Sequence, residues 1–225
     1  MSSTAKYAVI VAGGSGQRMG AAIPKQFLEM KGRPILMHTI EAFYHFPDRI
    51  KIVLVLPEAY MGKWKELCHH YDFKIPVTLQ PGGNTRFESV KKGLNMLSGD
   101  GLVAVHDGVR PLVDQKLIER SFQTALMYNS AVAAIPLKNS LREITENGSK
   151  AVDRERFRQV QTPQTFNLRL IKEAYRLVED AHYTDDASVW EAAGHPVTLY
   201  DGSEKNLKIT TIHDLVIAEI LWSFK

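Results

Sequence analysis

The sequence predicts an α/β fold in which a mostly parallel, twisted sheet carries helices on both faces. Short runs of β-branched and apolar residues alternate along the chain with longer amphipathic segments, as in strands joined by crossover helices. The short runs are continuously apolar, which is expected of strands buried on both faces. With 225 residues and 44% hydrophobic content, the chain can bury a full core. We therefore expect one domain over residues 1–225.

The expected strands are apolar runs bounded by glycine, proline or polar residues. In chain order they cover 7–12 (YAVIVA), 50–57 (IKIVLVLP), 76–81 (PVTLQP), 101–107 (GLVAVHD), 130–136 (SAVAAIP) and 195–202 (HPVTLYDG). Ligands of such folds bind beyond the carboxyl ends of the strands. Polar residues at these ends are therefore the first candidates for a site.

The expected helices have apolar residues at helical spacing between those strands. They cover 34–46, 61–71, 85–97, 114–128, 167–180, 184–194 and 211–222. A proline opens the first, Asn84 is the expected N-cap of the helix from residue 85, and Thr184 that of the helix from 184. Asp185 and Asp186 then fall in a first turn, where the helix dipole favours acidic residues. Capping explains this TDDAS segment without a metal site.

Residues 140–157 break the alternation of strand and helix. Strand-like flanks surround Asn147-Gly148, a pair that favours a type I′ hairpin. The segment is rich in charge and poor in large apolar residues, and an isolated hairpin is marginal in water. It must rest either on its own domain or, as an arm, on a second subunit. The pattern alone favours the first, because short surface hairpins are common.

Composition excludes several classes of function. The net charge is +3, and the basic residues are scattered among acidic ones, which suits a small anionic substrate better than nucleic acid. The single cysteine, Cys68, excludes an internal disulfide framework and indicates a reducing compartment. The apolar run near the N-terminus is too short for a membrane span. We expect a cytoplasmic protein with no membrane or nucleic-acid partner.

The segment AVIVAGGSGQRMGAAIPKQF, residues 8–27, has the character of a phosphate-binding loop after a strand. It does not fit a P-loop, because Ala21 follows Gly20 where a lysine and a hydroxyl would be needed. It fits a dinucleotide fingerprint poorly, because Met19 stands where the third glycine is usual and no acidic residue ends the second strand. A nucleotidyltransferase loop fits better.

In that interpretation, the glycines let backbone N–H groups approach a triphosphate. Arg18 supplies a planar fork for phosphate oxygens and Lys25 a point charge. Two such cations suit a transition state that gathers negative charge on phosphorus. Either residue alone would be an ordinary solvated loop cation.

The motif AGGSGQRMG…PKQF resembles the signature of the 2-C-methyl-D-erythritol 4-phosphate cytidylyltransferase family. PGGNTRFESV (81–90), VHDGVRP (105–111), VDRERFRQVQTPQTF (152–166), TDDAS (184–188) and NLKIT (206–210) resemble its other motifs in the same order. The resemblance implies a Rossmann-like nucleotidyltransferase fold, Mg²⁺, and a homodimer formed through a β-arm at 138–158. It also implies cytidylyl transfer from CTP to a methylerythritol phosphate, with release of pyrophosphate, in isoprenoid precursor synthesis.

The resemblance also implies roles for individual residues. The catalytic cations would be Arg18, Lys25, Arg154 and Lys208. CTP would bind at Ala12, Gly13, Gly14, Gly16, Gly83, Asn84 and Ser89. The polyol phosphate would bind at Asp107, Arg110, Ser140 and Thr162, with Asp107 also the magnesium ligand.

Bland structural roles stand beside these assignments. Asn84 could simply cap a helix, and Ser89 could be a helix-surface residue. Arg86 is expected nearby without a catalytic role, and His106 is expected to be a packed strand residue. Adjacent residues on a helix point apart, so Cys68, His69 and His70 do not form a metal site.

Three other functions compete with this one. A ribitol 5-phosphate cytidylyltransferase would share the loop, fold and chemistry. An NAD(P)-dependent oxidoreductase would use an irregular dinucleotide loop, and a non-catalytic nucleotide sensor would use the same fold. Titration with NADPH against CTP separates the oxidoreductase, and pyrophosphate release separates the sensor.

Overall fold

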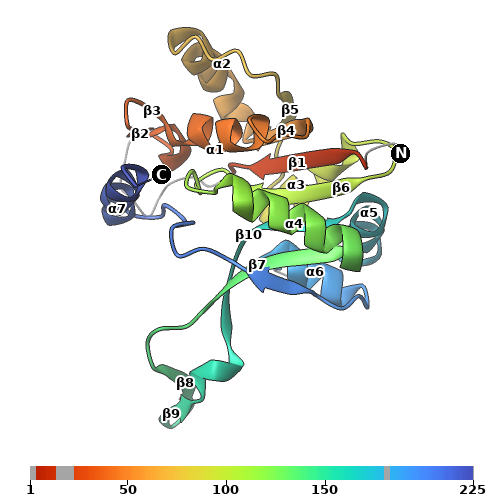
Figure 1. Ribbon diagram of the computed structural model, residues 1–225, viewed down its shortest axis with the longest axis vertical. Helices are drawn as coiled ribbons and strands as arrows, with labels where there is room; N and C mark the ends of the chain where they lie inside the picture. Colours follow the sequence, from red (N-terminus) through yellow and green to blue (C-terminus); the bar gives the residue numbers. More distant parts are fainter. Residues whose placement is uncertain (1–3, 14–22, 180–182, 225) are drawn as a thin grey trace.

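A seven-stranded, mostly parallel sheet forms the centre of the molecule (Figure 1). The computed structural model describes residues 4–13, 23–179 and 183–224. The strand order is β11-β7-β10-β6-β1-β4-β5. The strands are β1 (Lys6–Val11), β4 (Ile50–Leu56), β5 (Thr78–Pro81), β6 (Leu102–Asp107), β7 (Ser130–Pro136), β10 (Arg158–Asn167) and β11 (Leu199–Asp201). The predicted α/β fold is confirmed.

Helices cover both faces of this sheet (Figure 1). The face with Ala8 and Ile10 of β1 packs against α1 (Ile35–Tyr44), α2 (Met61–His70) and α4 (Gln115–Tyr128). The face with Tyr7 and Val9 packs against α3 (Arg86–Asn95), α5 (Leu168–Leu177) and α6 (Asp186–Ala192). Successive β1 residues thus enter opposite cores, which explains why the run is apolar throughout.

A third, smaller core lies at the carboxyl end of the sheet. Helix α7 (Ile212–Trp222) packs Leu215 and Ala218 against Val109 and Ile209. The short strands β2 (Glu29–Met30) and β3 (Arg33–Pro34) join the same cluster through Met30. This packing holds the segment that carries Lys208 above the end of β6.

Strand β10 is the one described member of the main sheet that the apolar pattern does not predict. It runs antiparallel between β6 and β7, with an irregularity between Val160 and Gln164. Its sequence, RQVQTPQTFN, is mainly polar. The side chains from Gln161 to Phe166 are nevertheless buried, and Thr162 and Gln164 form hydrogen bonds with Asp107, Asn206 and Asp185. Most of the motif at 152–166 therefore forms a strand.

The predicted hairpin is confirmed, but its predicted turn is wrong. Strands β8 (Leu141–Thr145) and β9 (Gly148–Val152) pair only with each other, and Thr145 faces Gly148 across the ladder. The two-residue turn is therefore Glu146-Asn147, and neither residue has the positive φ that a type I′ turn needs. The hairpin extends away from the body of the chain rather than lying on it (Figure 1). We call residues 138–158 the arm.

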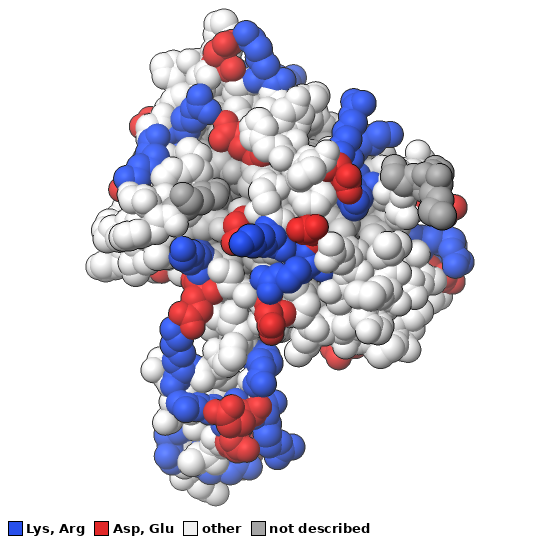
Figure 2. Space-filling view, viewed as in Figure 1, with Lys and Arg blue, Asp and Glu red and all other residues white. Residues whose placement is uncertain are grey.

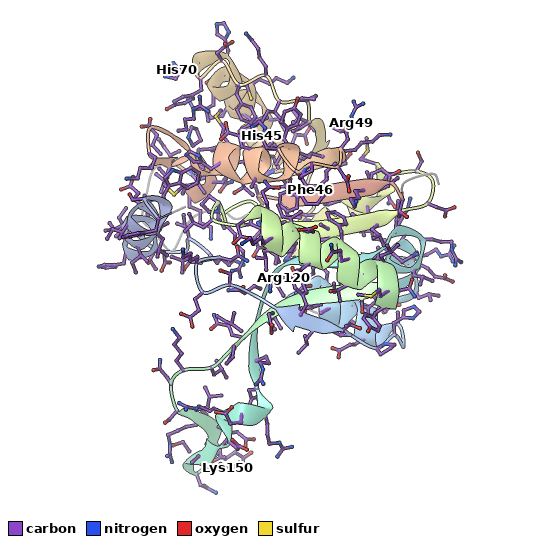
Figure 3. All side chains as sticks on the ribbon, in the orientation of Figure 1. His45, Phe46, Arg49, His70, Arg120 and Lys150 are labelled. Atoms are coloured by element: carbon purple, nitrogen blue, oxygen red, sulfur yellow. The ribbon has the colours of Figure 1, made fainter. Side chains whose placement is uncertain are left out.

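Basic and acidic side chains alternate along the arm (Figure 2), and Lys150 lies at its far end (Figure 3). Lys150 pairs with Glu143 at 2.8 Å across the two strands. The arm includes the short 3-10 helix η4 (Arg154–Arg156), whose three residues are not buried.

Two predicted helix caps are off by one residue. The Thr85 hydroxyl, not Asn84, caps α3 by accepting from the Glu88 N–H at 3.1 Å. The Asp185 carboxylate, not Thr184, caps α6 by accepting from the Ser188 N–H at 3.0 Å. In each case the neighbouring residue is equally suited to capping by type, so sequence alone could not choose between them.

Candidate active site

A pocket of about 270 Å³ opens where β1 and β6 end, beside the segment that joins β5 to the start of α3. Its lining comprises Val11, Ala12, Gly13, Lys25, Gln26, Gly83, Asn84, Thr85, Arg86, Ser89, Asp107, Val109 and Lys208. Six of the predicted binding residues therefore line one pocket, together with the predicted catalytic residues Lys25 and Lys208. The edge formed by strand carboxyl ends is the expected place for a ligand in this fold.

The start of the glycine loop is fixed by backbone and side-chain bonds. The Ala12 N–H donates to the Val55 carbonyl at 2.9 Å, and the buried Gln26 side chain donates to the Ala12 carbonyl at 2.8 Å. Lys25, in the 3-10 helix η2 (Lys25–Phe27), precedes Gln26 and lines the pocket. Gly14, Gly16 and Arg18 lie outside the described residues, so their roles stay predictions.

The second glycine segment is shaped by Ser89 from the first turns of α3. The Ser89 hydroxyl accepts from the Gly83 N–H at 3.0 Å and donates to the Thr85 carbonyl at 2.9 Å. Ser89 is only 3% exposed, so a helix-surface role is wrong. The Asn84 N–H donates to the Glu88 carboxylate at 2.7 Å, which leaves the Asn84 side chain at the exposed pocket rim.

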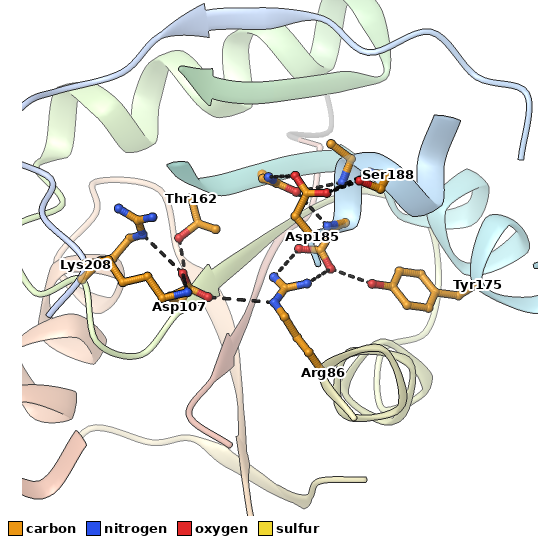
Figure 4. A network of polar contacts seen from close by, with 11 residues as sticks. Arg86, Asp107, Thr162, Tyr175, Asp185, Ser188 and Lys208 are labelled. Carbon is orange, nitrogen blue, oxygen red and sulfur yellow. Dashed lines mark hydrogen bonds and ion pairs between the residues drawn. The ribbon is translucent and has the colours of Figure 1, made fainter. Parts of the chain in front are cut away.

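Asp107, the last residue of β6, is the centre of charge in the site (Figure 4). Its carboxylate lies 3.0 Å from the Lys208 ammonium, 3.3 Å from Arg110 Nε and 4.0 Å from Arg86 Nε. Burial alone would raise the pKa of Asp107, but the charges of these three cations hold it well below its usual range. Asp107 is thus an anion held under excess positive charge.

Asp107 is supported by three residues that do not line the pocket, Thr162, Arg110 and Asn206. The Thr162 hydroxyl accepts from the Asp107 N–H at 3.1 Å. Arg110 donates to the Asn206 carbonyl at 2.8 Å, and the buried Asn206 amide donates to the Thr162 carbonyl at 2.7 Å. Arg110 and Thr162 are themselves buried and do not line the pocket. In the described chain they support the site rather than face a ligand.

His106 precedes Asp107 and is enclosed, as predicted for a packed strand residue. It is 0% exposed, its ring lies 5.0 Å from that of Phe43, and its Nε2 lies 3.2 Å from the Arg110 carbonyl. Burial lowers the pKa of His106 to about 4. The imidazole is therefore neutral beside Asp107 at neutral pH.

Ser140 and Arg154 belong to the arm, which extends away from the rest of the chain (Figure 1), and neither lines the pocket. Both are exposed, and Arg154 Nη1 donates to the Lys138 carbonyl within the arm at 2.5 Å. The chain by itself does not bring either residue to Asp107.

Cys68, His69 and His70 lie in the last turn of α2. Burial raises the pKa of the Cys68 thiol to about 11, so it is not a reactive thiolate. His70 lies at the outer end of α2 (Figure 3).

The donor set of the pocket suits a magnesium ion that shares its ligands with a substrate. Among the described residues, no group of three or more His, Cys, Asp or Glu side chains could hold a metal. Asp107 is the carboxylate of the pocket lining. One carboxylate with substrate phosphates and water is the coordination that Mg²⁺ commonly takes. The residues present therefore fit Mg²⁺ bound together with a triphosphate.

Several residues of the site were not assigned roles from the sequence. Gln26, Asn206 and Gln164 are buried polar residues inside the quoted motifs, and each fixes a loop by side-chain hydrogen bonds. Their residue type gives no signal of burial, because a buried amide needs partners that only the fold supplies. The sequence predicts no catalytic role for Arg86 and only a place in the first helical turn for Asp186. In the structure they form an ion pair at 2.6 Å in which Asp186 is buried.

The mostly parallel sheet, the glycine segment after its first strand and the cationic pocket at the strand ends define a nucleotidyltransferase of the α/β class. The model of the family "2-C-methyl-D-erythritol 4-phosphate cytidylyltransferase" matches residues 7–223. The chain belongs to this family.

Relatives and solved structures agree with this membership. The chain is 51% identical to the cytidylyltransferase of that name from Azobacteroides pseudotrichonymphae over 96% of this chain and 98% of that relative. It is 47% identical to the one from Bacteroides fragilis over 96% and 99% of the two chains. The crystal structure of 4-diphosphocytidyl-2C-methyl-D-erythritol synthase from Anaerococcus prevotii matches with a TM-score of 0.84 at 26% identity, covering 98% of this chain and 96% of that one. The Thermus thermophilus cytidylyltransferase matches with a TM-score of 0.75 at 32% identity, covering 96% and 98%.

Proposed function

We propose that the chain transfers a cytidylyl group from CTP to 2-C-methyl-D-erythritol 4-phosphate. The observation that carries this proposal is the Asp107 cluster, which places cations beside two glycine segments in one pocket. Both substrates are anions, and a catalyst must hold them together against their repulsion. The activity of the relatives is the second support.

The reaction needs positioning and charge stabilisation more than covalent help from the protein. An oxygen of the acceptor phosphate forms a bond to the α-phosphorus of CTP. The bond from that phosphorus to the bridging oxygen of the β-phosphate breaks, and pyrophosphate leaves with the electron pair. The acceptor phosphate is ionised near neutral pH, so no general base is required.

The described residues divide this work. Lys25 and Lys208 reach the pocket from opposite ends of the sequence and would stabilise charge that develops on the phosphorus. Gly13 and Gly83 offer close backbone approach to the nucleotide, with Ser89 fixing the second segment. Asp107 would hold Mg²⁺, which supplies charge neutralisation of the triphosphate when bound.

We further propose that two chains share each site, with the arm of one reaching the pocket of the other. The arm is not supported by its own chain, and it exposes Ile144 and Phe157 at 81% and 45%. Exposed apolar side chains on an otherwise marginal hairpin favour burial against a partner. Arg154 and Ser140 would then reach the acceptor phosphate of the neighbouring subunit.

A complementation experiment tests the shared site. Lys25→Ala and Arg154→Ala homodimers should each be nearly inactive. Unfolding and refolding them together in equal amounts makes half the dimers mixed, and each mixed dimer has one site without a lesion. Random assortment predicts about a quarter of the wild-type activity. Lys150→Ala, at the tip of the arm, is the matched control and should remain active.

Failure to recover activity, with mixed dimers confirmed by native mass spectrometry, would rule out the shared site. The cytidylyltransferase proposal is tested separately by pyrophosphate release from the wild-type protein with CTP and either methylerythritol phosphate or ribitol 5-phosphate. Preference for the ribitol substrate would overturn the proposed acceptor.

In the described part of the chain no helix is long and apolar enough to cross a membrane. The single cysteine supports a reducing compartment, for which we propose the cytoplasm.

A further inference from the structure

Asp186 is a carboxylate that helix capping does not explain. The adjacent Asp185 caps α6, accepting from the N–H and hydroxyl of Ser188. Asp186 instead is 0% exposed and turns into the molecule. An ionised carboxylate in such a place is costly unless it is paired and fully hydrogen-bonded. Its partners therefore indicate its purpose.

Those partners connect Asp186 to the active site (Figure 4). Its two carboxylate oxygens accept from the two terminal nitrogens of Arg86 at 3.0 and 2.6 Å. The Tyr175 hydroxyl, from α5, donates to the same carboxylate at 2.6 Å. The third nitrogen of Arg86, Nε, faces Asp107 at 4.0 Å. One guanidinium thus bridges a buried carboxylate and the reactive end of β6.

The three cations around Asp107 are not held equally. Arg86 is fixed by the two-pronged bond to Asp186, and Arg110 by its bond to the Asn206 carbonyl. Lys208 has a side chain 43% exposed, against 23% for Arg86 and 10% for Arg110. Within the described part of the chain, Lys208 forms its ion pair with Asp107. Lys208 is the cation with freedom to turn toward a ligand.

We propose that Asp186 and Arg86 are positioning residues that keep a fixed positive charge beside Asp107, so that Lys208 can leave it for a substrate phosphate. When Lys208 turns to the phosphate, Arg86 and Arg110 still neutralise Asp107. Without Arg86, more of the attraction of Asp107 falls on Lys208, which then competes with the substrate. This inference rests on the proposed cytidylyl transfer.

A purely structural link between α3 and α6 would not need these charges. Replacing a buried ion pair by neutral groups of similar volume is often neutral or stabilising, whereas removing one partner alone is strongly destabilising. The double variant Arg86→Gln/Asp186→Asn keeps polar side chains at both positions and leaves no unpaired charge, although glutamine is shorter than the arginine that it replaces. It separates the two roles, because it should fold as the wild type does but lack the charge beside Asp107.

The test measures kcat, KM for both substrates and the thermal midpoint in the pyrophosphate-release assay. We expect the double variant to keep its thermal midpoint within a few degrees and to lose about tenfold or more in kcat. Asp185→Asn is the matched control, since asparagine caps a helix as well as aspartate and Asp185 does not contact Arg86. It should have wild-type kcat.

A double-mutant cycle with Lys208 tests the route of the effect. If Arg86 acts by releasing Lys208, the Arg86→Gln/Asp186→Asn change should cost much less in a Lys208→Gln background than in the wild type. Full kcat in the folded double variant, or equal losses in both backgrounds, would overturn the inference. A wild-type protein without pyrophosphate release would instead overturn the proposed function on which it rests.

Discussion

The buried neutral His106 should make the stability of this protein fall as the medium becomes mildly acidic. Burial lowers the pKa of His106 from its ordinary value of 6.5 to about 4. Below pH 6.5 the unfolded chain takes up a proton at this residue, while the folded chain does not take one up until near pH 4. The unfolded state is therefore favoured increasingly as pH falls across this window.

The size of this effect follows from the two pKa values. Stability that is complete above the unfolded pKa is lost as pH falls through the folded pKa, and each pKa unit corresponds to about 1.4 kcal/mol. Between about pH 7 and about pH 4.5 the free energy of unfolding should decrease by about 2 kcal/mol through His106 alone. Asp107 acts in the same direction, but only at lower pH, because its pKa is lowered from 3.8.

Urea denaturation at fixed protein concentration, followed by tryptophan fluorescence, measures this dependence. His106→Gln removes the titrating group and keeps an amide that can reach the Arg110 carbonyl, so its free energy of unfolding should vary less across this pH window by about 2 kcal/mol. His70→Gln is the matched control, because this imidazole is exposed at the end of α2. If His106→Gln and the wild type show the same pH dependence, the reasoning is wrong.

Three further predictions concern the pocket. Lys25→Ala should lower kcat by about a hundredfold or more, with a smaller change in KM for CTP, because charge on the phosphate oxygens grows in the transition state; a raised KM at unchanged kcat would show that Lys25 serves binding alone. Ser89→Ala removes the acceptor of the Gly83 N–H and should raise KM for CTP roughly two- to tenfold. Steady-state kinetics measures this change, and a thermal midpoint within a few degrees of the wild type shows that the variant is folded. CTP should be used at least about tenfold more efficiently than UTP with the same acceptor, since a wrong base leaves polar groups unpaired; equal turnover would contradict cytosine recognition.

The parts of the fold that the sequence predicts are those whose burial is decided by apolar residues. β1, β4 and β6 are apolar on both faces and were placed within a residue or two. The apolar pattern does not predict β10, because its buried polar side chains find partners on other elements, as Gln164 does with the Asp186 N–H and the Asp185 carboxylate. Such a strand has no apolar period, and its position depends on partners that are distant in sequence.

The candidate site divides along the same line. Ala12, Gly13, Asp107 and Lys208 lie where motif and strand-end reasoning place them. The role of Asp186 could not be read locally, because an aspartate in the first turn of a helix is adequately explained by the helix dipole. Its bond to Arg86 joins residues 100 apart in the sequence, and only the folded core shared by α3, α5 and α6 brings them together.

The charge balance of the described site explains why both carboxylates belong in it. Lys25, Arg86 and Lys208 line the pocket, and Arg110 lies directly behind Asp107. Without the carboxylates, the four cations would repel one another, and covering them with substrate would carry a large desolvation cost. Asp107 and Asp186 offset part of this charge and fix the arginines, while the pocket keeps a positive excess for two phosphate-bearing substrates. Of the two carboxylates, only Asp107 lies where a substrate could reach it. Asp186 should therefore act on catalysis through Arg86, and the double-mutant cycle with Lys208 distinguishes this positioning effect from the loss of a direct contact with substrate.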